Sequence, residues 1–205
     1  RSLRATIQQL PADVRWALCD IAASDNGVVI AQALRDGTAV AVSNRSFKDK
    51  FGTAAWVIEG CHADGRVEGQ CIIPGGPEDQ SAYRSKLGGL YTIAAMVPVI
   101  CELHNIQEGS IEVACDGMNA LAQVGEADPI IRPNGAQYDI IAATQAKIKR
   151  TNIQWKMRHV MGHQDDTQGC TVMDRWETLN CRMDEQAKQH WLQHSTRTTR
   201  VQEAV

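Results

Sequence analysis

The chain has 205 residues, of which 43% are hydrophobic, 22% charged and 5% aromatic. This composition is typical of a globular protein and excludes a mostly disordered or fibrous chain. No apolar run approaches the roughly 20 residues of a membrane span, so we expect no transmembrane segment and no membrane partner. The 21 Lys and Arg against 24 Asp and Glu give a net charge of −3. This net charge excludes a surface that is basic overall and binds nucleic acid everywhere, but it is compatible with a local basic cleft.

The seven cysteines indicate the redox state of the protein's compartment rather than a catalytic or metal-binding role. Their number is odd and no CxxC pair occurs, so we expect unpaired thiols in a reducing intracellular compartment, with cytoplasm and nucleus undecided. A zinc site could be drawn from His163, Cys170, Cys181 and His190. Their spacings match no compact zinc motif, and we do not expect such a site.

The first half of the chain predicts a helical extension followed by a strand meander. Residues 1–36 contain two or three short apolar segments, broken at Pro11 and at the DNG triplet of 25–27, which favours short helices. We treat them as an N-terminal extension or linker. Three strands follow, with turn residues between them, which predicts an antiparallel meander. These strands are expected at residues 38–43, 52–59 and 65–73.

The second half alternates helices with strands, which favours parallel additions to the sheet. Helices are expected at residues 81–105, 118–124, 138–151 and 173–194, and strands at 110–115 and 153–160. Pro98 should kink or split the first of these helices. The fold class is therefore α/β, with a five-stranded mixed sheet and helices on both faces. We predict one domain over residues 37–193 and a polar C-terminal tail over 194–205.

Five short segments carry the polar residues that could do chemistry. They are SNRSF at 43–47, RSKL at 84–87, CDG at 115–117, VMGHQDD at 160–166 and LNCRMDEQAK at 179–188. The first and third each end a strand of the predicted sheet, and we consider the arrangement in which these two strands are adjacent. Asn44 and Asp116 would then face each other at its centre. Asp184 lies on a helix that can cross the same edge.

In order and position these segments resemble a ribonuclease H-like domain of the kind found at the end of retroelement reverse transcriptase polyproteins. The resemblance covers about residues 38–191. It implies a ribonuclease H-like fold and cleavage of the RNA strand of RNA–DNA hybrids by two Mg²⁺ ions, which stabilise the attacking water and the leaving oxygen. Such hard ions require carboxylate oxygens. The implied catalytic positions are Asn44, Lys86, Asp116, Asp184 and His163, the last being a mobile loop histidine.

Two of the four implied acid positions do not hold acids. Asn44 stands where the family has Asp, followed by Arg45 in place of the usual Gly, and Lys86 stands where it has Glu. Four carboxylates would give −4, whereas Asp116, Asp184 and Lys86 sum to −1. An ammonium about 4 Å from a dication repels it by several kcal/mol even at an effective dielectric constant of about 20. We therefore expect Mg²⁺ binding to Asp116 and Asp184 to be weak or lost, and hydrolysis with it.

The sequence allows two interpretations of the role of Lys86. In the first, its ammonium occupies the space of a metal ion and pairs with Asp116, and in some arrangements also with Asp184. In the second, it is an ordinary exposed helix lysine beside a decayed site. The resemblance further implies that Arg45, Ser46, Arg84 and Asn180 contact nucleic acid.

Three functions remain open from the sequence. The first is a catalytically impaired ribonuclease H-like domain that keeps a nucleic-acid-binding or scaffolding role. The second is an active or experimentally inactivated ribonuclease H that uses Mg²⁺. The third is a protein-interaction module on the same fold. The corresponding partners are an RNA–DNA hybrid or other nucleic acid, a reverse transcriptase region, or another protein.

Overall fold

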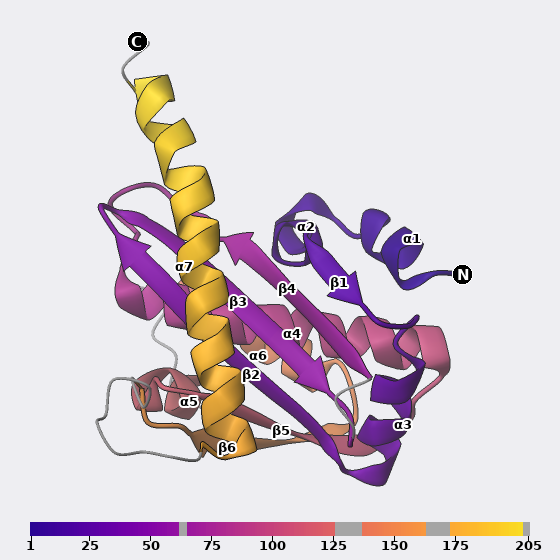
Figure 1. Ribbon diagram of the computed structural model, residues 1–205. Coiled ribbons are helices and arrows are strands. Elements are labelled where there is room, and N and C mark those ends of the chain that lie inside the picture. The colour runs from indigo at the N-terminus through magenta and orange to yellow at the C-terminus, as the bar shows by residue number, and fades with distance from the viewer. Residues whose placement is uncertain (62–64, 126–136, 163–172, 203–205) are drawn as a thin grey trace.

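A single mixed sheet with helices on both faces forms the molecule (Figure 1). The computed structural model describes residues 1–61, 65–125, 137–162 and 173–202, with side chains to residue 195. The strand order is β1-β4-β3-β2-β5-β6. The strands are β1 (Ile21–Ala23), β2 (Ala39–Lys48), β3 (Phe51–Glu59), β4 (Arg66–Ile72), β5 (Gly109–Cys115) and β6 (Ile153–His159). The helices are α1 (Leu3–Gln8), α2 (Ala12–Leu18), α3 (Val28–Asp36), α4 (Ala82–His104), α5 (Met118–Gly125), α6 (Tyr138–Lys149) and α7 (Arg175–Gln202).

The sheet confirms the predicted fold class, with one strand more than expected. β2, β3 and β4 pair antiparallel, and β5 and β6 add in parallel beside β2, which is the predicted ribonuclease H-like arrangement. The sixth strand is β1, which pairs antiparallel with the outer side of β4. Its three residues are too short to give a period-2 pattern, so the sequence did not predict it.

The first 36 residues belong to the same core as the rest of the chain. The predicted breaks are present: Pro11 precedes α2, and Gly27 precedes α3 in the left-handed region at φ 82°. Trp16 of α2 stacks on Tyr91 of α4, with ring centroids 5.2 Å apart and planes 10° apart. Apolar side chains of α1 and α2 are buried in the cluster that surrounds α4. This segment is thus an integral part of the folded unit.

The β2–β3 hairpin sets the register of the central strands. Asp49 and Lys50 both have positive φ, 54° and 57°, as the favoured two-residue hairpin turn requires. The resulting register pairs Asn44 with Ala55. On the other side of β2, Val42 pairs with Ala114 of β5. Asn44 and Asp116 each follow this pair by two residues, so the register brings both to the same end of two neighbouring strands.

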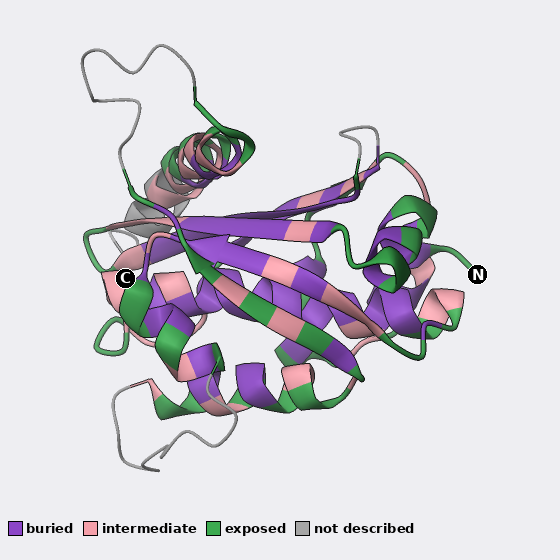
Figure 2. Cartoon of the chain, turned by 90° about the horizontal axis from the view of Figure 1, so that it is seen from below, coloured by how far each residue is buried: buried purple, intermediate pink, exposed green. Residues whose placement is uncertain are grey.

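The central strands are largely buried (Figure 2). Their side chains alternate between two apolar clusters, one on each face of the sheet. Val42, Val57 and Ala114 pack with Met183 beneath α7. The neighbouring positions in each strand point to the opposite face and pack beneath α4. Each fully buried aliphatic side chain contributes about 1.5–3 kcal/mol of transfer free energy. The position of α7 over β2 and β3 is therefore set by apolar packing, independently of any chemistry at its polar residues.

α4 is the core helix of the molecule. Ser81 caps its first turn by accepting a hydrogen bond from the backbone N–H of Arg84, at 2.9 Å. Of the two predicted effects of Pro98, a kink or a split, the split does not occur, because the helix runs through Pro98 to His104. Among the described residues, α4 is the one helix long and apolar enough to cross a membrane, which the sequence did not predict, but 78% of that segment is buried inside the fold. Packing against the sheet accounts for its apolar composition.

α7 is fixed at its start and extends beyond the predicted end. Asp174 and Glu177 cap it reciprocally, with hydrogen bonds of 2.8 and 3.1 Å. Arg175 binds the buried carboxylate of Glu59 at 2.9 Å, and Arg66 binds the same carboxylate from β4. The helix continues to Gln202, so the expected tail at 194–205 is helical through most of its length. In Figure 1 its C-terminal end projects away from the body.

Candidate functional site

Lys86 and Asp116 form an ion pair where the resemblance implies two metal-binding acids. Lys86 lies in the second turn of α4, and its Nζ is 3.6 Å from Oδ1 of Asp116. The side chains are only 23% and 15% exposed, which excludes the reading of Lys86 as an ordinary exposed lysine. Asp116 Oδ1 is buried and accepts no hydrogen bond, so the ammonium of Lys86 supplies its compensating charge.

The surroundings of Asp116 are close-packed. A Cβ at Gly162 would come within 3.1 Å of Asp116 Oδ2, and one at Gly117 within 2.8 Å of Lys86 Cδ. These two glycines therefore let the backbone approach the ion pair. The pair lines an open pocket of about 240 Å³ between the starts of α4 and α5. Tyr83 and Met118 are among the residues that complete its walls.

Asn44 joins β2 to α7 through hydrogen bonds that a carboxylate could not make. Its amide nitrogen donates to the main-chain oxygen of Asn180 at 3.3 Å and to the side-chain oxygen at 3.1 Å. Its own oxygen accepts from the backbone N–H of Arg45 at 2.8 Å. Both asparagines are buried. An ionised Asp has only acceptors and would face two oxygens here. The sequence did not predict this contact, because nothing in the pattern placed Asn180 opposite Asn44.

Asp184, the other retained acid, is also paired. Its Oδ2 lies 2.5 Å from Nζ of Lys188, one helical turn further along α7. This i,i+4 spacing could have been recognised in the sequence. The two acids contribute −2 and the two lysines +2, so the four groups sum to zero rather than to −1. Asp116 and Asp184 are therefore each already paired with a lysine ammonium.

The predicted nucleic-acid contacts divide into two pairs. Arg84 is only 4% exposed and does not fit the prediction, because its guanidinium forms a bidentate pair with Asp139 at 2.9 Å and also binds Pro74 and Gln137. The same hydrogen bonds lower the pKa of Asp139. Asn180 is likewise buried, in the contact with Asn44.

Arg45 and Ser46 are both half-buried in β2, so part of each side chain is open to solvent. Arg45 Nε is buried and has no hydrogen-bond partner. His163 lies outside the described residues, as do Asp165, Asp166 and Cys170. Its proposed role as the loop histidine stays a prediction.

The described residues do not fit two Mg²⁺ ions. Lys86 and Asn44 occupy two of the implied ligand positions, and neither offers an anionic oxygen. Over the described ranges, no three His, Cys, Asp or Glu side chains come together as a metal site would require. Filling the site with Mg²⁺ would require breaking both lysine pairs, and Lys86 would still repel the ion.

The chain is similar to solved ribonuclease H structures at low sequence identity. The N-terminal ribonuclease H domain of a Mycobacterium tuberculosis protein, fused to maltose binding protein, is 12% identical over 77% of this chain and 97% of that one, with a TM-score of 0.47. LC11-RNase H1 in complex with an RNA/DNA hybrid is 8% identical over 73% and 98%, with a TM-score of 0.48. RNase H1 of Halobacterium salinarum is 13% identical over 62% and 89%, with a TM-score of 0.42.

No family model and no curated protein matches the chain. The strand order and directions nevertheless agree with the mixed α/β sheet that the sequence predicts.

Proposed function

We propose that this chain is a ribonuclease H-like domain of retroelement origin that has lost two-metal hydrolysis and keeps a nucleic-acid-binding role. The observation that supports the proposal is the Lys86–Asp116 ion pair, in which a lysine ammonium lies 3.6 Å from the carboxylate that the resemblance implies as a metal ligand. The family activity, cleavage of the RNA strand of an RNA–DNA hybrid, would then be absent or weak. A fixed ammonium neutralises the retained acid but cannot activate a water as a metal ion does.

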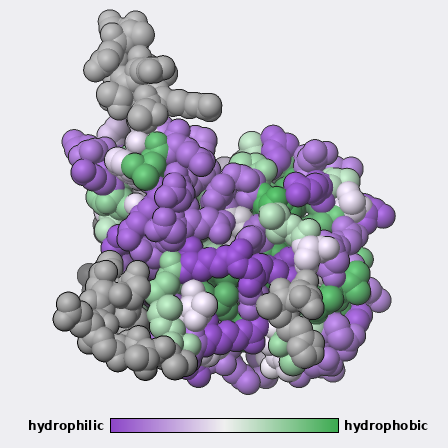
Figure 3. Space-filling view, viewed as in Figure 1, coloured by the Kyte–Doolittle hydropathy of each residue, from purple (hydrophilic) through white to green (hydrophobic). Residues whose placement is uncertain are grey.

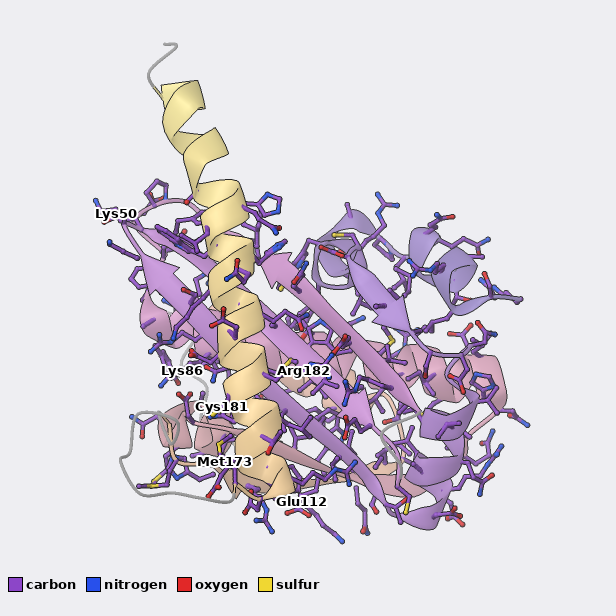
Figure 4. All side chains as sticks on the ribbon, in the orientation of Figure 1. Lys50, Lys86, Glu112, Met173, Cys181 and Arg182 are labelled. Atoms are coloured by element: carbon purple, nitrogen blue, oxygen red, sulfur yellow. The ribbon has the colours of Figure 1, made fainter. Side chains whose placement is uncertain are left out.

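Charge at the surface favours nucleic acid over an apolar partner. With the acids of the site neutralised, Arg45 on β2 has no acidic partner among the described ion pairs. Lys48 and Lys50 are exposed at the hairpin that ends the same strand. Lys50 and Lys86 both lie to the left of α7 in Figure 4. The face crossed by α7 is largely hydrophilic, with small separate hydrophobic patches (Figure 3). Phosphate backbones are recognised by such cations.

The test is cleavage of a labelled RNA–DNA hybrid with Mg²⁺ or Mn²⁺. The wild-type chain is compared with Asn44→Asp/Lys86→Glu and with a control of equal charge change, Asn152→Asp/Lys149→Glu, at two exposed positions. We expect no cleavage by wild type or control, and cleavage by the first double variant. Cleavage by wild type would overturn the proposal in favour of an active ribonuclease H.

Binding is measured separately from cleavage. Fluorescence anisotropy with the same hybrid should show affinity that falls steeply with salt, because phosphate contacts release counterions. Lys48→Gln/Lys50→Gln should weaken binding and flatten the salt slope, whereas Lys149→Gln should leave both unchanged. Absence of hybrid binding together with a tight protein partner would favour the interaction module instead.

A further inference from the structure

Two histidines on α7 face each other away from the acid site. His190 and His194 are one turn apart, and their ring centroids are 4.3 Å apart with planes at 57°. They follow Asp184 by six and ten residues, which places them about 9 and 15 Å further along the helix axis. Nothing in the implied ribonuclease chemistry uses them, so they form a separate feature of the molecule.

The rings are spaced as two ligands of one metal ion are spaced. Histidines at i and i+4 on a helix lie on one face and can bind the same zinc ion. With each nitrogen about 2.0–2.1 Å from zinc, the two ring centres come to lie about 5 Å apart. The observed separation of the ring centroids, 4.3 Å, is close to that spacing.

His190 carries a second observation that points to a ligand. The residue is only 5% exposed, yet its Nδ1 is buried without any hydrogen-bond partner. A buried polar atom left unpaired is costly, and it needs an explanation such as an ion. Burial, and next the neighbouring His194, lower the pKa of His190, which keeps the imidazole in the neutral form that metals bind. Asp20, a hydrogen-bond partner of Gln70, acts on His190 with a negative charge.

We propose that His190 and His194 form a two-imidazole site for a borderline divalent transition-metal ion, with Zn²⁺ as the physiological candidate. Imidazole suits Zn²⁺, Ni²⁺ and Cu²⁺, whereas Mg²⁺ prefers oxygen ligands. No third His, Cys, Asp or Glu joins the pair within the described ranges, so water would complete the coordination. The ion would tie two successive turns of α7 together.

The experiment measures the melting temperature of the full chain with about 1 mM ZnCl₂, and separately NiCl₂, because an ion bound only by the folded state raises it. Wild type is compared with His194→Gln and with the exposed neighbour Gln193→Ala as control. We expect a rise of a few degrees in wild type and control, and its loss in His194→Gln. MgCl₂ should give no rise that depends on His194.

A second readout separates this site from thiol binding at the exposed Cys19 and Cys61. Electron paramagnetic resonance with one equivalent of Cu²⁺ should show two nitrogen ligands in wild type and fewer in His194→Gln. Equal metal-induced stabilisation of wild type and His194→Gln, or a Cu²⁺ spectrum unchanged by the substitution, would overturn the proposal. Neither result bears on hybrid cleavage, so the proposed function is tested independently.

Discussion

The amide nitrogen of Asn44 lies 3.1 Å from the side-chain oxygen and 3.3 Å from the main-chain oxygen of Asn180. This relationship ties the middle strand of the sheet to the helix that crosses it. A carboxylate at position 44 would bring negative charge to two oxygens in a buried site. At the position where the resemblance implies an acidic metal ligand, the amide of Asn44 thus supplies a contact that a carboxylate could not make.

Asn44→Asp should therefore destabilise the fold. We expect a loss of about 1–3 kcal/mol, the usual range for a buried polar group that loses its partner. Urea unfolding at pH 7 measures it, with Asn152→Asp as a control at an exposed position. Equal stability of Asn44→Asp and the control would show that the contact contributes nothing.

The Lys86–Asp116 pair should appear as a coupling in a double-mutant cycle. Both side chains are partly exposed, so the interaction free energy between Lys86→Met and Asp116→Asn should be about 0.5–1 kcal/mol. Chemical denaturation of wild type, both single variants and the double variant gives this value. Strictly additive effects would mean that the two side chains do not interact in solution.

Glu59 should be more important for stability than any carboxylate in the site. It is buried and binds Arg66 and Arg175, which fixes the start of α7 to the β3–β4 hairpin. Removing its charge leaves two guanidinium groups without their shared partner, and Glu59→Gln should cost about 3 kcal/mol. Thermal unfolding tests this against Glu108→Gln, an exposed position. If Glu59→Gln lowered the melting temperature no more than Glu108→Gln does, the predicted importance of Glu59 would be contradicted.

Asp139 should contribute to acid sensitivity. Hydrogen bonding from Arg84 lowers its pKa below the ordinary value of 3.8. Its stabilising contribution is therefore complete above pH 3.8 and is lost as the pH falls through the lower, folded-state pKa. Asp139→Asn should be less stable than wild type at pH 7, and the difference should shrink towards pH 2. Denaturant titrations between pH 7 and pH 2 measure the difference in free energy of unfolding between wild type and Asp139→Asn. A difference that does not change with pH would contradict the lowered pKa of Asp139.

The fold was largely predictable from the sequence, and the site only in part. The short apolar runs of β2 and β3, with turn residues between them, and the apolar composition of α4 are local signals that can be recognised in a single sequence. The Lys86–Asp116 pair could be foreseen because both residues sit at ends of predictable elements. The Asn44–Asn180 contact and the burial of Arg84 depend on side chains from distant segments, for which no local pattern exists. β1 is defined by its partner strand rather than by its own residues.

The pairing of β1 with β4 has a consequence for how the chain can be divided. Ile21, Ala22 and Ala23 cover the backbone of β4 from Val67 to Gly69. A fragment that began at residue 37 would leave that edge open to strand addition from a second copy, and would uncover the ring of Tyr91 as well. The first 36 residues thus cover a strand edge and an aromatic ring, and removing them should increase self-association through β4.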